Sequence, residues 1–563
     1  MNNFDYKNMT PFKWFVLENF PFIENDFDAI NNYHLFSKVV EYLNQTIDNM
    51  NLTGTQMENV TNAMTELQNY VNNYFDNLEV QEEINNKLND MVEDGTMNEL
   101  IAPYLDIFTN LLNVEVGDLQ NQINNMSIIE KLRIKNNTFN PFVLPEISNI
   151  DFFKQIPIYY NGSKFITDFD VSSLKNISNH TYYVSPSGND ENDGLTENTP
   201  FFSLQKAYTT ANHLDTIICL EGVYHRNNLI YVENRAIKKS LNIIGKGNVV
   251  FCESDSLNWE LNSTYNIYEA TRSNVLQVID FRNIQKGITT RLEYKNSILD
   301  CANSENSWYT DNNKVYVHLA NNEEPLNDFI SCTLKTNLPT LHINEQVIDC
   351  LVYLENIKIV DAHTSNLLCR RNNTFKCTLV AKECYFYNQY WDRAADTDAV
   401  SIQGANAIFQ RCKAYYSNKD GFNYHKYMDN VTNAIEIDCS AGYNGYQRIT
   451  ENYAASNGST AHDGTKVLRI NGIYHNSRGP NVADVQNNTM SVNLGCIAYD
   501  NILKDDLPEN CDFFTMQGNA KMYLYNCITE NSNSLYQLGA YGETQIYQKN
   551  CKFNTKRGNV NNL

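Results

Sequence analysis

The stretch KECYFYN, residues 382–388, and its later relatives decide the fold of this chain. QRCKAYYSN (410–418) and EIDCSAGYNG (436–445) keep the same order: strand-forming residues, a Cys, a few residues, then Asn or Gly. The first two cysteines of the series are 28 residues apart and the next two are 27 apart, which indicates stacked repeats that cannot bury a core singly. Further members surround Ile473, Cys496, Cys527 and Cys551.

The distribution of the 14 cysteines along the chain favours free thiols over disulfides. None precedes Cys219, no C-x-x-C pair is present, and about half occupy the repeated position. A free buried cysteine packs like a small apolar residue. We therefore expect a stack of reduced thiols inside a helix of strands, in a chain made in a reducing cytosol.

The composition of the chain argues against several classes of binding partner. A net charge of −23 over 563 residues argues against nucleic acid and against anionic membrane surfaces. We expect no secretory signal, because no basic N-terminal stretch precedes an apolar run. No apolar stretch approaches the roughly 20 residues that a membrane span requires.

Residues 1–135 carry a seven-residue apolar period instead. The a/d pattern is strongest from Met57 to Leu78, and a second short run begins at Leu112. Such a seam requires partner helices, supplied either by an intramolecular hairpin or by other subunits. We favour a homotrimer. One seam contains Phe36, Leu43, Met50, Met57, Met64, Val71 and Leu78.

The rest of the chain divides into a connector and a β domain. We predict a connector over residues 136–180, which begin Asn-rich, and short alternating strands over residues 181–563. The repeat is interrupted near residues 255–345, where SWYTDNNKVYVH predicts a hairpin with a DNN turn. We interpret this interruption as an inserted β region.

Three stretches resemble one family. Residues 10–44 with 80–101 look like the attachment region of tail appendages from phages of Gram-positive bacteria, with Pro-Phe, Trp-Phe and DGT elements in place. YYVSPSGNDENDGLTENTPFFSLQKA resembles the opening of a pectate-lyase-like right-handed parallel β-helix. NGSTAHDGTKVLRING (457–472) is similar to a segment of the tail spikes, or pre-neck appendages, of small short-tailed phages.

The resemblance implies a mainly β, trimeric virion spike that follows an α-helical attachment region and touches the host cell wall. Its partners would be tail or collar proteins and a wall polysaccharide, and in some such spikes the β-helix degrades teichoic acid or another wall glycan. Localisation would be the virion, after synthesis in the host cytoplasm.

A second series accompanies the cysteines in the repeats. Its members are 19 to 24 residues apart, so we predict that they stack on neighbouring coils about 4.8 Å apart. Asp-Gly and Asn-Gly are also ordinary turn signals, which leaves a purely structural role open. The series is Asp398, Asp420, Asn444, Asp463 and Asp484.

The surroundings of this series suggest chemistry. Stacked carboxylates repel, which raises one pKa and lets that group act as a general acid. Arginine binds phosphate or carboxylate, and Tyr rings stack on sugars. Candidate catalytic residues are Asp396, Asp398, Asp420, His462 and Asp463. Candidate substrate contacts are Tyr424, His425, Tyr443, Arg448, Arg469 and Asp484.

The elements DTD, KDG, AHD and the Arg469 strand are also loosely similar to those of polygalacturonase-type hydrolases, although the step from Asp420 to His462 is too long. Three functions stay open: a hydrolase of a wall polymer, a non-catalytic receptor-binding adhesin, and a structural rod. For a phosphodiester polymer the Asp group would hold a divalent cation or act as a base, with Arg neutralising the phosphate; no cofactor is otherwise indicated.

Overall fold

The computed structural model describes residues 140–563, except residues 145, 162–163, 231–235, 373, 391–397, 446–455, 502–510 and 531–534. The chain divides into two compact units, Met1–Asn137 and Thr138–Leu563. All of the described residues belong to the second unit. The heptad region, and with it the predicted coiled coil and trimer, lies outside the described residues.

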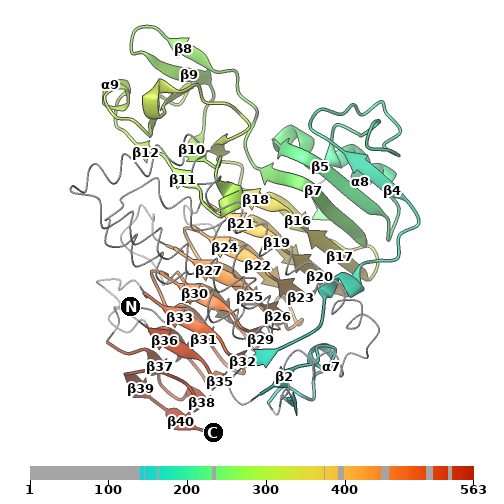
Figure 1. The fold of residues 1–563 in the computed structure, drawn as a ribbon, viewed down its shortest axis with the longest axis vertical. Helices are drawn as coiled ribbons and strands as arrows, with labels where there is room; N and C mark the ends of the chain where they lie inside the picture. The colour runs from blue at the N-terminus through green and yellow to red at the C-terminus, as the bar shows by residue number, and fades with distance from the viewer. Residues whose placement is uncertain are drawn as a thin grey trace, which may run out of the picture. The chain divides into compact units, whose positions relative to one another are not determined.

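The prediction of a mainly β chain built from parallel strands is confirmed (Figure 1). One face of the coil stack is a ten-stranded sheet, in which each strand pairs in parallel with the strand of the next coil. We call it the site sheet. Its strands, in spatial order, are β6 (Ala236–Ile237), β16 (Leu341–Ile343), β19 (Leu367–Arg370), β22 (Val400–Gln403), β25 (Phe422–His425), β28 (Ser459–Ala461), β31 (Val482–Val485), β34 (Phe513–Met516), β37 (Leu538–Ala540) and β39 (Lys556–Gly558).

The other two faces are parallel columns that share the long strand β7. The first column holds β4 (Thr181–Val184), β5 (Thr216–Tyr224), β7 (Leu241–Cys252), β17 (Cys350–Glu355), β20 (Cys377–Lys382), β23 (Asn406–Gln410), β26 (Asn433–Ile437), β29 (Lys466–Ile470), β32 (Met490–Leu494), β35 (Lys521–Tyr525), β38 (Gln545–Lys549) and β40 (Val560–Asn562). The second holds β18 (Lys358–Val360), β21 (Tyr385–Tyr387), β24 (Lys413–Tyr415), β27 (Ser440–Gly442), β30 (Ile473–His475), β33 (Ile497–Tyr499) and β36 (Ile528–Glu530). Helix α8 (Leu204–Thr210), capped by Ser203, precedes β5.

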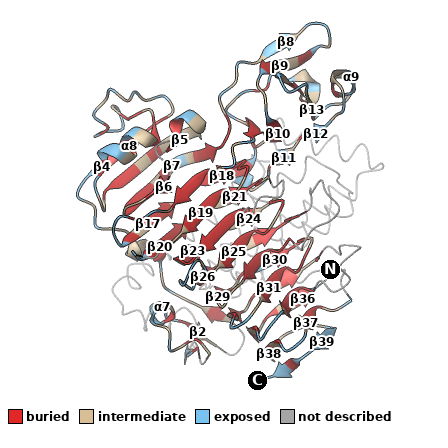
Figure 2. Ribbon diagram, turned by 180° about the vertical axis from the view of Figure 1, so that it is seen from behind, coloured by how far each residue is buried: buried red, intermediate tan, exposed pale blue. Residues whose placement is uncertain are grey.

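The interior of the stack is largely apolar, because most of the alternate strand residues that point inward are apolar. Phe422, Val400 and Ala434 lie in one core cluster that runs the length of the coils. Figure 2 shows the stacked strands as largely buried, whereas β39 is exposed.

The cysteine prediction is confirmed: all 14 thiols are free, and all but Cys551 are buried. Each repeat cysteine except Cys551 stands directly before a second-column strand. At that place in the coil of β30 the sequence has Gly472, and Ile473 begins the strand. A Cβ on Gly472 would lie 2.3 Å from the Tyr474 hydroxyl, so the Tyr474 ring fills the volume that a cysteine fills elsewhere.

Much of the predicted connector is folded against the coils. It contains β1 (Asn140–Pro141), α7 (Asp151–Lys154), β2 (Tyr159–Tyr160), β3 (Phe165–Ile166) and the 3-10 helix η4 (Val171–Leu174). We call residues 140–174 the strap. Phe153 and Phe165 are buried in a second core, against the outward face of the first column from Tyr353 to Tyr525.

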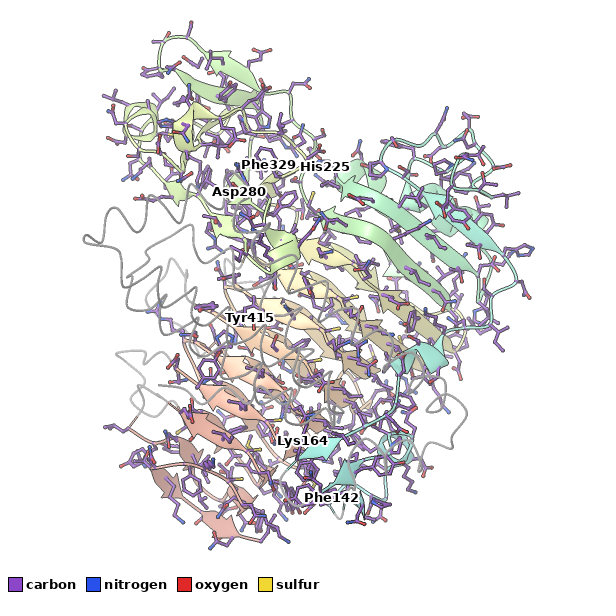
Figure 3. All side chains as sticks on the ribbon, in the orientation of Figure 1. Phe142, Lys164, His225, Asp280, Phe329 and Tyr415 are labelled. Carbon is purple, nitrogen blue, oxygen red and sulfur yellow. The ribbon has the colours of Figure 1, made fainter. Side chains whose placement is uncertain are left out.

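The interruption of the repeat lies between β7 and β16, and most of its strands pair antiparallel. Asp280 and Phe329 mark this insertion at the opposite end of the stack from Phe142 and Lys164 of the strap (Figure 3). Its elements are β8 (Glu260–Asn262), β9 (Ile267–Thr271), β10 (Val275–Asp280), β11 (Thr290–Arg291), β12 (Glu293–Tyr294), α9 (Ile298–Ala302), β13 (Ser307–Thr310), β14 (Lys314–His318) and β15 (Ile330–Leu334).

The insertion leaves the stack at the corner between the second column and the site sheet. The Gln277 amide donates to the Asn388 carbonyl at 3.0 Å, and Arg291 donates to Asn418 at 3.0 Å. Later in the chain, the connections from β21 to β22, from β27 to β28 and from β33 to β34 fall at this same corner. The corner therefore carries the longest departures from the repeat.

Candidate functional site

The candidate site lies on the outward face of the site sheet, at β22, β25 and β28. Phe422 and Tyr424 of β25 point into the core, so the alternating residues Asn423 and His425 face outward. The corner turn that ends at β25 adds Lys419 and Asp420 beside them.

Asp398 and Asp420 occupy the same place on neighbouring coils, two residues before β22 and β25. The Ala399 amide donates to the Asp420 carbonyl at 2.9 Å, which fixes the two turns together. Both side chains are at most 2% exposed. Burial, and next the charge of Asp420, raise the pKa of Asp398 to about 7. Asp398 is therefore divided between its protonated and ionised forms near neutral pH.

Asp420 is held in place through one of its two oxygens. Its Oδ1 accepts the Asn457 backbone N–H at 2.8 Å and lies 3.4 Å from the Lys419 ammonium. Its Oδ2 is buried and has no hydrogen-bond partner among the described residues. That oxygen is available to accept a proton or to bind a ligand.

Three more buried oxygens near this pair have no partner in the described part of the chain: Asn423 Oδ1, Asn457 Oδ1 and Thr460 Oγ1. Asn423 and Thr460 are register partners on β25 and β28, and a hydrogen bond from Asn423 partly offsets the raised pKa of Asp398. With Asp398 and Asp420 they form what we call the oxygen cluster. Carboxylate and amide oxygens are the ligands of hard divalent cations, so the cluster fits such an ion by donor type. No group of three His, Cys, Asp or Glu suited to a metal is found in the described ranges.

A pair of histidines adjoins the cluster. The rings of His425 and His462 stack with centroids 4.2 Å apart and planes 7° apart. His425 Nδ1 lies 3.2 Å from Asp463 Oδ2. Burial, and next the nearness of His425, lower the pKa of His462 well below its usual value, so His462 is neutral at physiological pH.

Three predicted substrate contacts lie inside the coils instead. Tyr424, Arg469 and Asp484 are fully buried because their strand positions point inward. Glu436 accepts from the Tyr424 hydroxyl at 3.0 Å and lies 3.4 Å from Arg469 Nε, while Arg469 Nη1 lies 3.6 Å from Asp484 Oδ1. We assign these residues to an internal polar network and not to substrate binding.

Tyr443 lies on another part of the surface, at the end of the second column. Its ring stacks on Tyr416 with centroids 5.3 Å apart and meets His475 edge-on at 5.3 Å. The stacking of these rings on one another covers their faces. Tyr443 as a sugar contact remains a prediction.

The predicted single column of Asp and Asn residues is not formed. In strand register, Asn457 continues the place of Asp398 and Asp420, whereas Asp463 follows β28 and Asp484 lies within β31. Counting residues failed because the connection from β27 to β28 is longer in sequence than the connections that precede β25 and β31. Asp396 and Arg448 lie outside the described residues.

Lys419, Asn423 and Asn457 were not predicted. One signal could have found Asn457: Asn457-Gly458 before β28 repeats Asp420-Gly421 before β25. Asn423 carries no signal of its own, because an Asn inside a strand is informative only once its face is known.

No protein family model and no curated protein match the sequence. Among solved structures, a glycoside hydrolase has a TM-score of 0.46 at 10% identity, covering 68% of this chain and 96% of its own. Pectate lyase Pel9A has a TM-score of 0.31 at 14% identity, covering 67% and 80%. The tailspike protein gp49 from Pseudomonas phage LKA1 has a TM-score of 0.22 at 10% identity, covering 62% and 64%.

Within the residues that the structure describes, no helix is long and apolar enough to cross a membrane.

Proposed function

We propose that this chain is a phage tail appendage whose β-helix binds a host-surface polysaccharide and hydrolyses it at Asp398 and Asp420. The observation that carries the proposal is the buried pair itself, in which the pKa of Asp398 is raised to about 7. The proposal that the chain is a tail appendage is supported by the sequence resemblance of residues 10–44, 80–101 and 457–472 to such proteins. The polymer would be teichoic acid or a capsular glycan of the host wall.

Glycoside hydrolysis uses one carboxyl group that protonates the leaving oxygen and a second that activates water or attacks, placed on either side of the scissile bond. Asp398 donates its proton to the oxygen of the leaving sugar as the glycosidic C–O bond breaks. Asp420 accepts a proton from the water whose oxygen attacks the anomeric carbon. The Lys419 ammonium lies 3.4 Å from this second carboxyl and pairs with it.

The histidine pair has a binding role in this proposal. His462 is neutral and stacked, and His425 is oriented by Asp463 at 3.2 Å. Together they offer polar edges and an aromatic face beside the reacting bond. Asp463 then acts by orienting His425.

A divalent cation is the alternative for a phosphodiester polymer. The oxygen cluster would hold it, with Asp398 and Asp420 both ionised, and the ion would polarise the phosphoryl oxygen. Treatment with a chelator separates the two chemistries: fragment release that survives the chelator supports the glycosidase, and release restored by Ca²⁺ or Mg²⁺ supports the phosphodiesterase.

The test is release of fragments from purified host-wall teichoic acid and capsule. We expect Asp398→Asn and Asp420→Asn each to lower the rate by about 10²- to 10⁴-fold while polymer binding persists. Asp429→Asn is the matched control, since that side chain is fully exposed on a turn. If the wild-type protein binds the polymer and releases nothing, the chain is a receptor-binding adhesin and not an enzyme.

The proposal also includes a homotrimer attached to tail or collar proteins through residues 1–135, whose heptads supply the seam. Sedimentation equilibrium of the full chain tests the trimer: a mass of one 64.8 kDa chain contradicts it.

A further inference from the structure

The side chains on the outward face of the site sheet are of a different type beyond β31. Up to β28 this face carries the polar groups of the site, but from β34 onward its side chains are aromatic and aliphatic apart from Arg557 of β39. Ala483, Cys511 and Phe514 form a small separate cluster, with Met516, Tyr536 and Tyr541 packed on it partly exposed. We call Phe514, Tyr536, Tyr541 and Arg557 the aromatic platform.

A glycine lets the platform lie close to the sheet. Gly539 of β37 faces outward as the register partner of Phe514. A Cβ at this position would lie 2.4 Å from Cys511 Sγ, 2.9 Å from the Tyr541 ring and 3.4 Å from the Phe514 ring. The two rings therefore cover the bare backbone of Gly539, with centroids 5.2 Å apart and planes tilted by 50°.

Arg557 adds a positive charge to these rings. It lies on β39, whose three residues are exposed, at one end of the site sheet. Its guanidinium carbon lies 4.7 Å from the centre of the Tyr541 ring and 5.8 Å from that of Tyr536. Cation–π contacts at these distances orient the guanidinium, and its N–H groups suit a carboxylate or phosphate.

The position of the platform relative to the site identifies a polymer as its ligand. Strand order along the sheet is β25, β28, β31, β34, β37. With about 4.8 Å between neighbouring strands, β37 lies about 19 Å from β25 across the sheet. A single sugar cannot span that distance, whereas several linked sugars can. A chain bound on this face reaches both groups without leaving the sheet.

We propose that the aromatic platform is a remote binding subsite for an anionic polysaccharide. Sugar rings lie on Tyr541 and Tyr536, and a carboxylate or phosphate substituent pairs with Arg557. This inference rests on the proposed function, because it concerns the same polymer. Remote contacts of this kind hold the chain while the reacting bond sits at Asp398 and Asp420.

The experiment compares long and short substrates. We expect Tyr541→Ala and Arg557→Gln to reduce kcat/KM for polymer by about tenfold, and to leave cleavage of fragments too short to reach β37 unchanged. Tyr547→Ala is the matched control. Tyr547 lies on β38, the next strand along the chain, which belongs to the first column and not to the site sheet. Its ring stacks on that of Tyr523 with centroids 4.9 Å apart. Equal losses on long and short substrates, or no loss on polymer, would overturn the subsite.

Binding measurements keep the inference testable if no cleavage occurs. Retention of the full chain on immobilised polymer should fall about tenfold for Arg557→Gln with an anionic polymer and remain unchanged with the same polymer after its carboxylates are reduced. A polymer whose charge is phosphate instead of carboxylate identifies which anion is bound. Unchanged retention of Arg557→Gln on both anionic polymers contradicts the proposal even where the enzyme proposal has already failed.

Discussion

Asp398 is the residue on which the enzymatic proposal depends. Its pKa is raised to about 7 by burial first and by the charge of Asp420 second, so near neutral pH it is divided between acid and carboxylate. A general acid works only while protonated. We predict that kcat/KM falls as pH rises through about 7, and a rate–pH profile on short fragments measures this limb. A profile that is flat from pH 5 to pH 9 would rule out Asp398 as the acid.

The same pKa predicts a change in stability. Because the folded-state pKa lies above the unfolded value of about 3.9, the folded chain binds this proton more tightly, and stability is lost as pH rises from about 4 to about 7. The Asp398→Asn variant has no carboxyl at this position, so it does not lose stability over this pH range. At pH 8 we expect it to exceed the wild type by up to about 4 kcal/mol in free energy of unfolding, and at pH 4 to match it. Urea denaturation at the two pH values measures the difference; equal stability at pH 8 would contradict the burial argument.

At the scale of the element, the coil that carries β29 has charges in its core. Arg469 is fully buried and lies 3.4 Å from Glu436 and 3.6 Å from Asp484. Arg469→Leu leaves two buried carboxylates without a cation, and we expect a loss of about 3–5 kcal/mol. The loss should be smaller at low pH, where Asp484, whose pKa burial raises to about 6, takes up a proton. Arg411→Leu, which breaks an exposed pair with Glu383 at 2.8 Å, is the control and should cost less than about 1 kcal/mol. Thermal unfolding measures the loss of stability in each variant. Equal losses for Arg469→Leu and Arg411→Leu would argue against an internal network.

The coil of β30 departs from its neighbours by exchanging two residues together. Gly472 replaces the repeat cysteine, and Tyr474 stands where β24, β27 and β33 have inward alanines. Gly472→Cys places a side chain against the Tyr474 hydroxyl, so we expect a loss of about 1–3 kcal/mol.

Combining Gly472→Cys with Tyr474→Ala restores the common pattern and should recover part of that stability. The recovery is partial because Glu436 loses a hydrogen bond of 2.8 Å from Tyr474. Unfolding midpoints of the single and double variants test this pairing, and purely additive losses would contradict it.

At the scale of the whole molecule, the sequence predicted the architecture better than the site. The repeat spacing indicated stacked parallel coils, since one small residue per coil must fill the same place, and Cys384, Cys412 and Cys439 do so. It misplaced Arg469 and Asp484 because their inward direction depends on strand register, which a turn of variable length obscures. The strap escaped prediction for another reason: its apolar residues have no period, and they are buried only by a surface formed far away in sequence.

The strap connects coils that are far apart along the stack, whereas the repeats connect only neighbouring coils. In a solenoid each coil contacts its neighbours, so terminal coils can unfold separately. The strap spans several coils: Lys382 donates to Asp170 at 3.0 Å, Tyr160 to Asn526 at 3.0 Å, and Tyr525 to Glu146 at 2.6 Å. It therefore couples coils distant along the stack.

We predict that breaking the strap in the full chain uncouples the C-terminal coils from the rest. Phe165→Ala removes a fully buried ring beside Phe142 and should cost about 3–5 kcal/mol. Hydrogen exchange should then show β32, β35 and β38 losing protection before β17 and β20, because the C-terminal coils have fewer neighbours on one side. Phe202→Ala, in the turn before α8 and remote from the strap in sequence, is the control. Uniform loss of protection along the stack in Phe165→Ala would mean that the coils unfold as one unit without the strap.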